Sequence, residues 1–249
     1  MLVVLPPSET KRDGGADGSS LDLSLLSHPE LRGSRRAVLS STRKLSTNLA
    51  TMSAALKLGP NQRFELLRNR ALTTSPTMPA IDRYTGVLYD ALAADSLSDA
   101  ARAFATDHLV IQSALFGLLG ASDPVPAYRL SHDSRLPGLS LRSTWRGPVS
   151  KVLAAHDGLI LDLRSEAYVS LGPAPRHRTD VFYLRVVSEG TDGRQRALNH
   201  FNKKGKGEFT RALLESGSSF DTVESLLRWA TGQGMRLSRG AAGELDLVV

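Results

Sequence analysis

The chain has 249 residues, 41% of them hydrophobic, which is enough to bury a sizeable core without disulfides or metal sites. It contains no cysteine, so disulfide frameworks, iron–sulfur clusters, thiolate zinc sites and cysteine nucleophiles are excluded. The net charge of +6 favours anionic partners such as nucleic acid, nucleotides or membrane surfaces, although plentiful arginine throughout the chain would give the same excess.

The first half of the sequence predicts a buried strand, a polar loop and several helices. The apolar run MLVVLPP predicts a short strand over 1–7, and the glycine-rich loop after it is where a binding loop often lies in an α/β sheet. The first residues do not resemble a signal peptide, and no window approaches ~18 apolar residues, so no membrane span is expected. Helices are expected over 19–30, 35–56, 61–72 and 96–108, the last capped by Ser96 or Ser98, while 78–92 fits a helix or a strand.

The second half predicts a long loop followed by alternating strands and helices. Residues 109–120 begin like a buried strand, and 121–143 form a loop with three prolines whose length is typical of a functional segment. The remaining elements are a helix over 144–156, a strand over 158–163, a hairpin with strands near 180–188 and 194–201, helices over 207–216 and 220–231, and strands at 235–239 and 245–249. We expect a mixed α/β fold, with a mixed sheet flanked by helices, in a single compact domain over residues 1–249.

The stretch NHFNKKGKGEFTRALLES (199–216) places four cationic side chains around two glycines before a predicted helix. It resembles the second half of a helix-hairpin-helix motif, in which a glycine turn brings backbone N–H groups to phosphate oxygens at a helix N-terminus. The alternative is the end of a hairpin followed by an ordinary helix with solvated lysines. The predicted phosphate- or nucleic-acid-binding residues here are Lys203, Lys204, Gly205, Lys206, Gly207 and Arg211.

Positive charge is concentrated around this stretch. Nine Lys or Arg residues and four acidic residues lie between Arg176 and Arg211, so this segment carries +5 of the chain's +6. A local field of this size indicates a nucleic-acid surface or a pocket for a phosphorylated small molecule.

Three further polar clusters follow predicted strands or lie in the long loop. A buried Lys11 can bind phosphate or act as a base, and Arg129 can clamp an anion. The alternatives are structural: an exposed loop, an arginine paired with a carboxylate, and a helix cap formed by Ser165. In chain order the clusters are Ser8, Glu9 and Lys11; Tyr128 and Arg129; and Asp162, Arg164, Ser165, Glu166 and Tyr168.

Other common signatures are absent from the sequence. The six histidines show no i, i+4 pair and no H-E-x-x-H, so neither a metal site nor a cofactor is predicted. There is also no Walker A motif, no G-x-G-x-x-G after a strand and no G-x-S-x-G.

An ordered set of motifs spans nearly the whole chain: MLVVLPPSETK, RYTGVLYDAL (83–92), SALFGLLGASDPVPAYRL (113–130), LILDLRSEAYVSL (159–171) and HFNKKGKGEFTRALL (200–214). With this set the chain resembles the YaaA family of peroxide stress proteins. The resemblance implies a cytoplasmic protein of the hydrogen peroxide response that limits free iron and oxidative DNA damage. It also implies a mixed α/β fold with a positively charged cleft, a helix-hairpin-helix element and DNA binding, with the basic turn, Tyr128, Arg129, Ser165 and Tyr168 as matching site residues.

Two functions are compatible with such a cleft. The first is a stress protein that binds double-stranded or damaged DNA through phosphate contacts that are largely indifferent to sequence. The alternative is an enzyme acting on a nucleotide, nucleoside or damaged nucleic acid, in which Glu166 is the acid or base and Lys11 or Lys204 stabilises charge. The other residues expected in its cleft are Ser8, Tyr128, Arg129, Ser165 and Tyr168.

Overall fold

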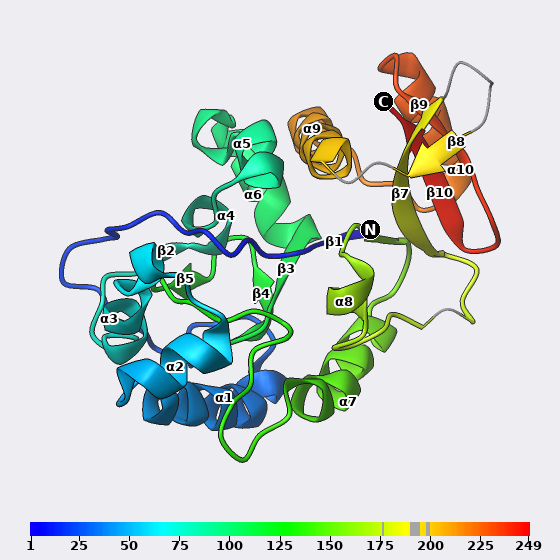
Figure 1. Cartoon of the computed structure of the whole chain (residues 1–249). Coiled ribbons are helices and arrows are strands. Elements are labelled where there is room, and N and C mark those ends of the chain that lie inside the picture. Colours follow the sequence, from blue (N-terminus) through cyan, green and yellow to red (C-terminus); the bar gives the residue numbers. More distant parts are fainter. Residues whose placement is uncertain (176, 190–194, 198–199) are drawn as a thin grey trace.

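The computed structural model describes residues 1–175, 177–189, 195–197 and 200–249, and strands and helices alternate along the chain (Figure 1). The strands are β1 (Leu2–Leu5), β2 (Met78–Pro79), β3 (Leu109–Ser113), β4 (Gly117–Gly120), β5 (Pro124–Val125), β6 (Ile160–Asp162), β7 (Val181–Glu189), β8 (Gln195–Ala197), β9 (Arg236–Arg239) and β10 (Glu244–Val248). The α-helices are α1 (Arg32–Leu45), α2 (Leu49–Leu56), α3 (Glu65–Arg70), α4 (Ala80–Arg83), α5 (Val87–Leu92), α6 (Asp99–His108), α7 (Leu141–Ala154), α8 (Glu166–Val169), α9 (His200–Ser216) and α10 (Val223–Gly232).

A mixed sheet runs through the described residues in the strand order β4-β3-β1-β6-β7-β10-β9, with β8 paired to β7. The pairs from β3 through β1, β6 and β7 to β10 are parallel, whereas β4, β8 and β9 are antiparallel to their neighbours. The chain leaves β1 for β3 on one side and later enters β6 on the other, so the strand order reverses at β1. Ligands of open α/β sheets bind at such a reversal, beyond the carboxyl ends of the strands.

The centre of the sheet is buried because its sequences are continuous apolar runs. Every residue of β1, β3 and β6 is buried, which is typical of parallel strands that are covered on both faces. The predicted strands at 1–7 and 158–163, and the strand beginning at 109, are therefore confirmed. The sequence-based prediction of a mixed α/β fold with a mixed sheet is confirmed as well.

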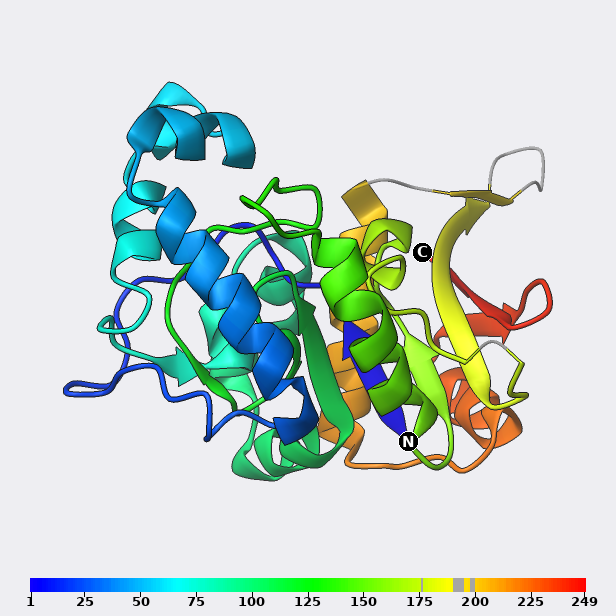
Figure 2. The same ribbon diagram turned by 90° about the horizontal axis from the view of Figure 1, so that it is seen from below.

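Helices cover both faces of the sheet. α1 and α7 lie on one face, and α5, α6 and α9 lie on the other (Figures 1 and 2). In Figure 2, β1 runs from the N-terminus toward the edge that the irregular segment 126–140 crosses. Among the residues that the structure describes, no helix combines the length and the apolar character that a membrane span requires.

The predicted glycine turn is wrong, because residues 200–216 form one continuous helix, α9, with Gly205 and Gly207 inside it. A glycine costs about 1 kcal/mol in a helix interior, so local propensity opposes this helix and packing favours it. A Cβ on Gly207 would lie 2.2 Å from the Leu88 carbonyl oxygen of α5, and one on Gly205 would lie 2.9 Å from Val249. The glycines allow α9 to approach its neighbours closely, and their N–H groups lie beyond the unpaired first turn.

The hairpin before α9 is confirmed in its paired strands. β7 and β8 are antiparallel, with Val187 opposite Ala197, while the turn residues 190–194 lie outside the described residues. The predicted second strand ends earlier than expected, because α9 already begins at His200.

Two other predicted helices differ from the structure. Residues 35–56 form two helices, because Asn48 has extended backbone geometry and its side chain caps α2 by accepting a hydrogen bond from the Thr51 N–H. The Ser46 carbonyl at the end of α1 accepts instead from Arg70 Nε at 2.7 Å. Residues 19–30 contain turns and the start of a 3-10 helix (Pro29–Leu31) in place of an α-helix.

Several local signals are borne out. Ser98 caps α6 by accepting from the Ala101 N–H at 3.2 Å, as expected for one of the two candidate serines. The ambiguous stretch 78–92 contains both types of structure: β2, then α4 and α5 separated at Tyr84 to Gly86. The strand pair after α10 is present as β9 and β10.

Candidate functional site

Segments that are far apart in sequence meet beyond the carboxyl end of β1. Lys11, in the loop after β1, forms an isolated antiparallel bridge with Tyr84, which separates α4 from α5. Tyr128, from the long loop, lies against both residues and also bonds Ser113 at the end of β3. The site is therefore assembled at the reversal of strand order.

A buried arginine fixes the segment that follows Lys11. Arg83 is fully buried and its guanidinium donates to the carbonyl oxygens of Arg12 (2.6 Å), Gly14 (3.0 Å) and Val125 (3.0 Å). Of the three acceptors, the Val125 carbonyl belongs to a buried residue and would otherwise need another partner. Arg83 thus ties the first loop to the strand that precedes the long loop.

Lys11 is the most buried amine of this site, with 6% of its surface exposed. Its Nζ donates to the carbonyl oxygens of Ser8 (2.9 Å) and Glu9 (3.2 Å). The same nitrogen lies 4.1 Å from the ring centroid of Tyr128 and 5.4 Å from that of Tyr84. Main-chain carbonyls and tyrosine faces therefore replace the water that would surround an exposed ammonium.

Burial lowers the pKa of Lys11 to about 7. The carboxylate of Glu65 acts in the opposite direction, whereas the nearby cations of Arg129 and Arg68 lower the pKa further. Glu65 is itself buried and is paired with Arg68 at 3.1 Å, so it only partly supports the ammonium form. A substantial fraction of Lys11 is consequently a neutral amine near neutral pH, able to act as a base or a nucleophile.

A chain of three hydroxyls lies beside Lys11. Tyr84 Oη and Tyr128 Oη are 2.7 Å apart, and Tyr128 Oη is 2.6 Å from Ser113 Oγ. Burial raises the pKa of Tyr84 well above its usual value and raises that of Tyr128 to about 12, so both remain protonated at neutral pH. Tyr89 packs against Tyr84 and donates to the Pro6 carbonyl oxygen at 2.7 Å, which links α5 to the first loop.

Arg129 is held from two sides. Its backbone N–H and carbonyl are both bonded, at 2.8 Å, to the side-chain amide of the fully buried Asn69. Its guanidinium pairs with Glu9 Oε2 at 2.7 Å, although Arg129 itself is only 8% exposed. The ion pair anchors Glu9, and Glu9 lies in the loop whose Ser8 and Glu9 carbonyl oxygens accept hydrogen bonds from Lys11 Nζ.

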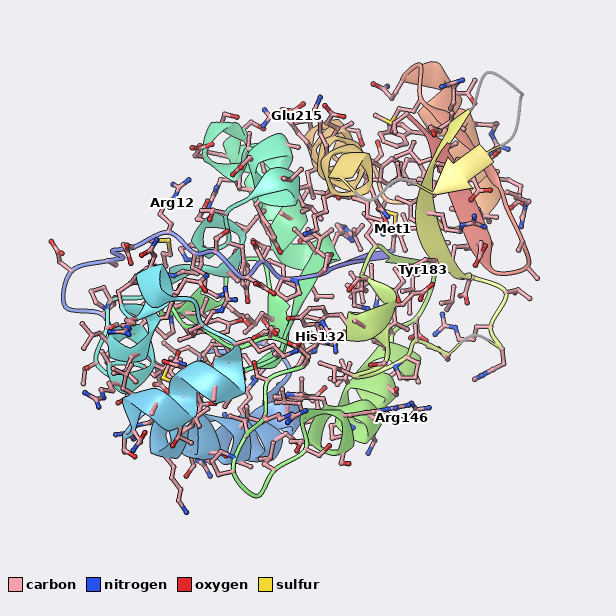
Figure 3. All side chains as sticks on the ribbon, in the orientation of Figure 1. Met1, Arg12, His132, Arg146, Tyr183 and Glu215 are labelled. Carbon is pink, nitrogen blue, oxygen red and sulfur yellow. The ribbon has the colours of Figure 1, made fainter. Side chains whose placement is uncertain are left out.

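The polar residues after β6 line the same edge of the sheet. Ser165 is the residue before α8, where its side chain makes no capping hydrogen bond, and Glu166 is exposed in the first turn. Tyr168 is buried, with its ring centroid 5.4 Å from that of His132, which lies beside α8 in Figure 3. Burial raises the pKa of Tyr168 above its usual value, and Tyr128 and Glu9 add to this effect, so the α8 segment adjoins the Lys11 cluster.

Asp162 and Arg164 have a structural place at the end of β6. Arg164 is fully buried and donates to both carboxylate oxygens of Asp162, at 2.7 and 2.6 Å, and to the Gly172 carbonyl oxygen at 2.9 Å. It also donates to the side chain of Gln112 in β3. The pair fixes the segment that leads from β6 into α8.

The four cations predicted on the glycine stretch differ in their surroundings. Lys203 and Lys204 are exposed near the start of α9, and Lys204 is paired with Glu208 at 3.2 Å. Lys206 is 4% exposed, and burial lowers its pKa to about 8. Arg211 donates to the Leu92 and Ala93 carbonyl oxygens, at 3.0 and 2.9 Å, and so caps the end of α5.

A model of the family described as "Peroxide stress protein YaaA" matches residues 1–238. The chain belongs to the YaaA family. Among the relatives of this YaaA-family chain, a UPF0246 protein of Corynebacterium efficiens is 42% identical over 258 aligned residues and is covered completely, as is the chain itself. A UPF0246 protein of Corynebacterium glutamicum strain R is 41% identical, with 94% of each chain covered, and one of Streptomyces coelicolor is 40% identical, with 88% of this chain and 85% of the relative covered.

The structure brings the motifs of the YaaA-family resemblance together in part. Lys11, Tyr128, Arg129 and Tyr168 form one cluster, with Ser8 supplying a carbonyl oxygen. Ser165 and Glu166 lie on the same strand edge, whereas the basic stretch belongs to α9 on one face of the sheet. No group of three or more His, Asp or Glu side chains within the described ranges is placed to hold a metal ion.

Sequence reasoning did not single out Tyr84, Ser113, Glu65 and Asn69 as residues of this cluster, although Tyr84 lies in one of the quoted motifs. Ser113 ends a buried strand, which is a general signal for a site position, but nothing local links it to Tyr128. Glu65 and Asn69 are four residues apart on α3 and are both buried, which is unusual for a carboxylate and an amide. Two polar residues on the buried face of a short helix were the signal that could have indicated a role in the site.

Proposed function

We propose that this YaaA-family chain serves the peroxide stress response as an enzyme that acts on a nucleotide, nucleoside or damaged nucleic acid, with Lys11 as its reactive amine. The observation that carries the proposal is the amine itself: it is buried at the reversal of strand order, held by two carbonyl oxygens and covered by two tyrosines. A perturbed amine in such a position is typical of active sites.

The distribution of cations favours chemistry over surface binding. A surface that binds DNA phosphates presents exposed Lys and Arg side chains. Here Lys11, Arg129 and Lys206 are each less than a tenth exposed, and Arg211 is bonded to the end of α5. These groups are better placed to act on a small group inside the protein than to follow a DNA backbone.

The other side chains have roles that fit this proposal. Tyr84 and Tyr128 are neutral hydroxyl donors, and Arg129 with Glu9 fixes the loop that holds Lys11. Glu166 is exposed at the start of α8, where it is available as an acid or base at the edge of the site. Lys203 and Lys204, near the start of α9, supply positive charge for a phosphate group of the ligand.

The test is a screen of peroxide-treated nucleotides, nucleosides and duplex DNA for conversion by the protein, followed by mass spectrometry. We expect Lys11→Met to lose at least about 100-fold in rate, the usual contribution of a working acid–base group. Lys151→Met, which removes an exposed lysine of α7, is the matched control and should retain full activity. Full activity in Lys11→Met would refute the proposal, and loss in Glu166→Gln would add Glu166 to the machinery.

A second candidate function is binding of double-stranded or damaged DNA without chemistry. Its support is the exposure of Lys203 and Lys204 near the N-terminal end of α9, where unpaired N–H groups and the helix dipole also favour anions. Two phosphate contacts would make the slope of log affinity against log salt concentration about −2.

Fluorescence binding of a labelled duplex across a salt series tests this candidate. The Lys203→Ala/Lys204→Ala variant should lose most of the slope. The matched control is Arg146→Ala/Lys151→Ala, which removes the same charge from α7, across the sheet from α9; Figure 3 labels Arg146 there and Glu215 on α9. Equal slopes for the two double variants would exclude α9 as the DNA contact.

A further inference from the structure

At its Ser113 end, the hydroxyl chain beside Lys11 has a fixed direction. Ser113 Oγ accepts hydrogen bonds from the N–H groups of Leu115 and Phe116, both at 3.0 Å, and these occupy its two lone pairs. Its own proton is therefore donated to Tyr128 Oη at 2.6 Å. Tyr128 Oη and Tyr84 Oη share a further hydrogen bond at 2.7 Å in which either can be the donor, so one of the two phenol protons is left over.

When Tyr128 is the donor of this pair, the proton of Tyr84 is left at the open end of the chain. Among the described residues, the hydroxyls of Tyr128 and Ser113 are its hydrogen-bond neighbours, and Ser113 Oγ already accepts two bonds. Tyr84 is only 2% exposed, and its burial keeps the hydroxyl protonated by raising its pKa well above the usual value. A covered donor without an acceptor costs free energy unless a ligand supplies one.

The open donor lies next to the amine. Lys11 and Tyr84 face each other across a backbone bridge, and Lys11 Nζ lies 5.4 Å from the Tyr84 ring centroid. The Lys11 nitrogen already donates two hydrogen bonds, one to the Ser8 carbonyl oxygen and one to the Glu9 carbonyl oxygen. A nucleophilic nitrogen and a neutral hydroxyl donor in one covered site match the two ends of a polarised C=O bond.

We propose that Lys11 and Tyr84 form a carbonyl-binding site, in which Lys11 adds to the carbon of an aldehyde or ketone and Tyr84 donates a hydrogen bond to its oxygen. The inference rests on the proposed function, because it names the reactive group that a nucleotide- or nucleoside-derived substrate presents to Lys11. The open-chain form of a pentose phosphate carries such an aldehyde at one end and a phosphate at the other.

The step is balanced without a further reactant. The nitrogen lone pair forms the C–N bond, the π pair of C=O moves to oxygen, and the proton lost by nitrogen reaches that oxygen. The carbinolamine then releases water and becomes an imine of Lys11, which hydrolysis reverses. Tyr84 keeps its proton throughout and acts as a donor to the oxygen while charge develops on it.

Reductive trapping tests the amine. The full-length protein is incubated with propanal or with ribose 5-phosphate and cyanoborohydride near neutral pH, and the modified lysines are located by peptide mass spectrometry. We expect Lys11 to be labelled at least about tenfold faster than Lys44 or Lys151, because ordinary lysines are almost fully protonated at that pH. Labelling of Lys11 should level off above about pH 8, whereas that of ordinary lysines keeps rising. Equal or slower labelling of Lys11 would overturn the proposal.

Paired phenylalanine variants test the donor. Tyr84→Phe should lower Lys11 labelling by about tenfold or more, the usual scale for loss of one donor to a developing oxyanion. Tyr89→Phe is the matched control, since Tyr89 donates to the Pro6 carbonyl oxygen outside the chain of hydroxyls, and it should label like the wild type. If the two variants label alike, Tyr84 has no such role. The pH profile of labelling should be the same in wild type and Tyr84→Phe, because a change would indicate a disturbed Lys11 environment.

The outcomes separate this inference from the proposed function. Labelling with propanal requires no nucleic-acid component, so it can succeed even if no nucleotide substrate is found. If Lys11 is not labelled while Lys11→Met still abolishes conversion in the nucleotide screen, Lys11 acts as a base and the carbonyl site is refuted.

Discussion

Lys11 makes the stability of the protein depend on pH. Its pKa is about 7 in the folded state and near 10.5 in the unfolded chain, so between these values the unfolded chain binds more protons. The cost of burying Lys11 is therefore full below pH 7, and the free energy of unfolding rises with pH up to about 10.5. Relative to Lys11→Met, the wild type should gain about 1 kcal/mol per pH unit between about pH 7.5 and 9.

Urea denaturation of both proteins at several pH values measures this difference. Lys206, whose pKa is about 8, is present in both proteins and cancels in the comparison. Lys151→Met, which removes an exposed lysine, should follow the pH dependence of the wild type. Parallel curves for wild type and Lys11→Met would mean that Lys11 keeps an ordinary pKa.

Arg211 is expected to stabilise the fold and to contribute little to ligand affinity. It donates to two carbonyl oxygens at the end of α5, to Ser96 Oγ at 2.8 Å, and pairs with Glu215 at 2.6 Å. Arg211→Met should lower the free energy of unfolding by about 1–3 kcal/mol, because covered carbonyls lose their partners. The slope of log DNA affinity against log salt concentration should stay at the wild-type value. A slope shifted toward zero would indicate that Arg211 contacts a phosphate.

Single residues of the cluster could be predicted as site residues when the local sequence placed them in a loop of a recognisable kind. Lys11 follows a buried strand and Tyr128 lies in a long proline-rich loop, and both signals are local. The bond between Tyr128 and Ser113 was not predictable, since it depends on how the long loop folds back over the end of β3. The burial of Lys206 was missed for the same reason: a lysine beside two glycines is typical of a solvated turn, and only the packing of α9 covers it.

At the level of elements, α9 depends on its glycines for close packing against α5. Gly207→Ala should destabilise the protein by about 2 kcal/mol despite the better helix propensity of alanine, because its Cβ would meet the Leu88 carbonyl oxygen at 2.2 Å. Gly232→Ala, in the last turn of α10, is the control: its Cβ would enter open space, so the change should be neutral or stabilising by up to about 1 kcal/mol. Thermal unfolding compares the two, and a stabilised Gly207→Ala would contradict the packing.

Element types were predictable where the local pattern and the tertiary structure agree. Continuous apolar runs predicted β1 and β6, and the two candidate cap residues, Ser96 and Ser98, predicted the start of α6. The prediction failed where packing outweighs local preference, as in α9, and where a capping residue interrupts an otherwise continuous helical pattern, as Asn48 does.

At the level of the whole molecule, residues 236–249 belong to the body of the protein, although the match to the family model ends at residue 238. β10 lies between β7 and β9, with Leu245 opposite Leu184, and Leu245 is completely buried. Removing 236–249 should expose one side of β7 and yield insoluble or non-cooperatively unfolding protein.

Soluble yield and a urea unfolding curve test this expectation. Ser238→Ala, an exposed change on β9, should behave like the wild type. A shortened chain that unfolds cooperatively with wild-type stability would mean that the first 235 residues fold independently. The sequence predicted the two final strands but not the insertion of β10 beside β7, because strand order is a property of non-local pairing.

The two bonds that hold Lys11 Nζ both come from the main chain, at Ser8 and Glu9. The position of the Lys11 amine therefore depends directly on the backbone path of the loop through residues 8 and 9. A change of side chain at position 8 should therefore leave the amine in place, whereas a change at position 9 also removes the carboxylate that pairs with Arg129. A one-residue insertion or deletion between β1 and Lys11 would instead carry both carbonyls out of reach.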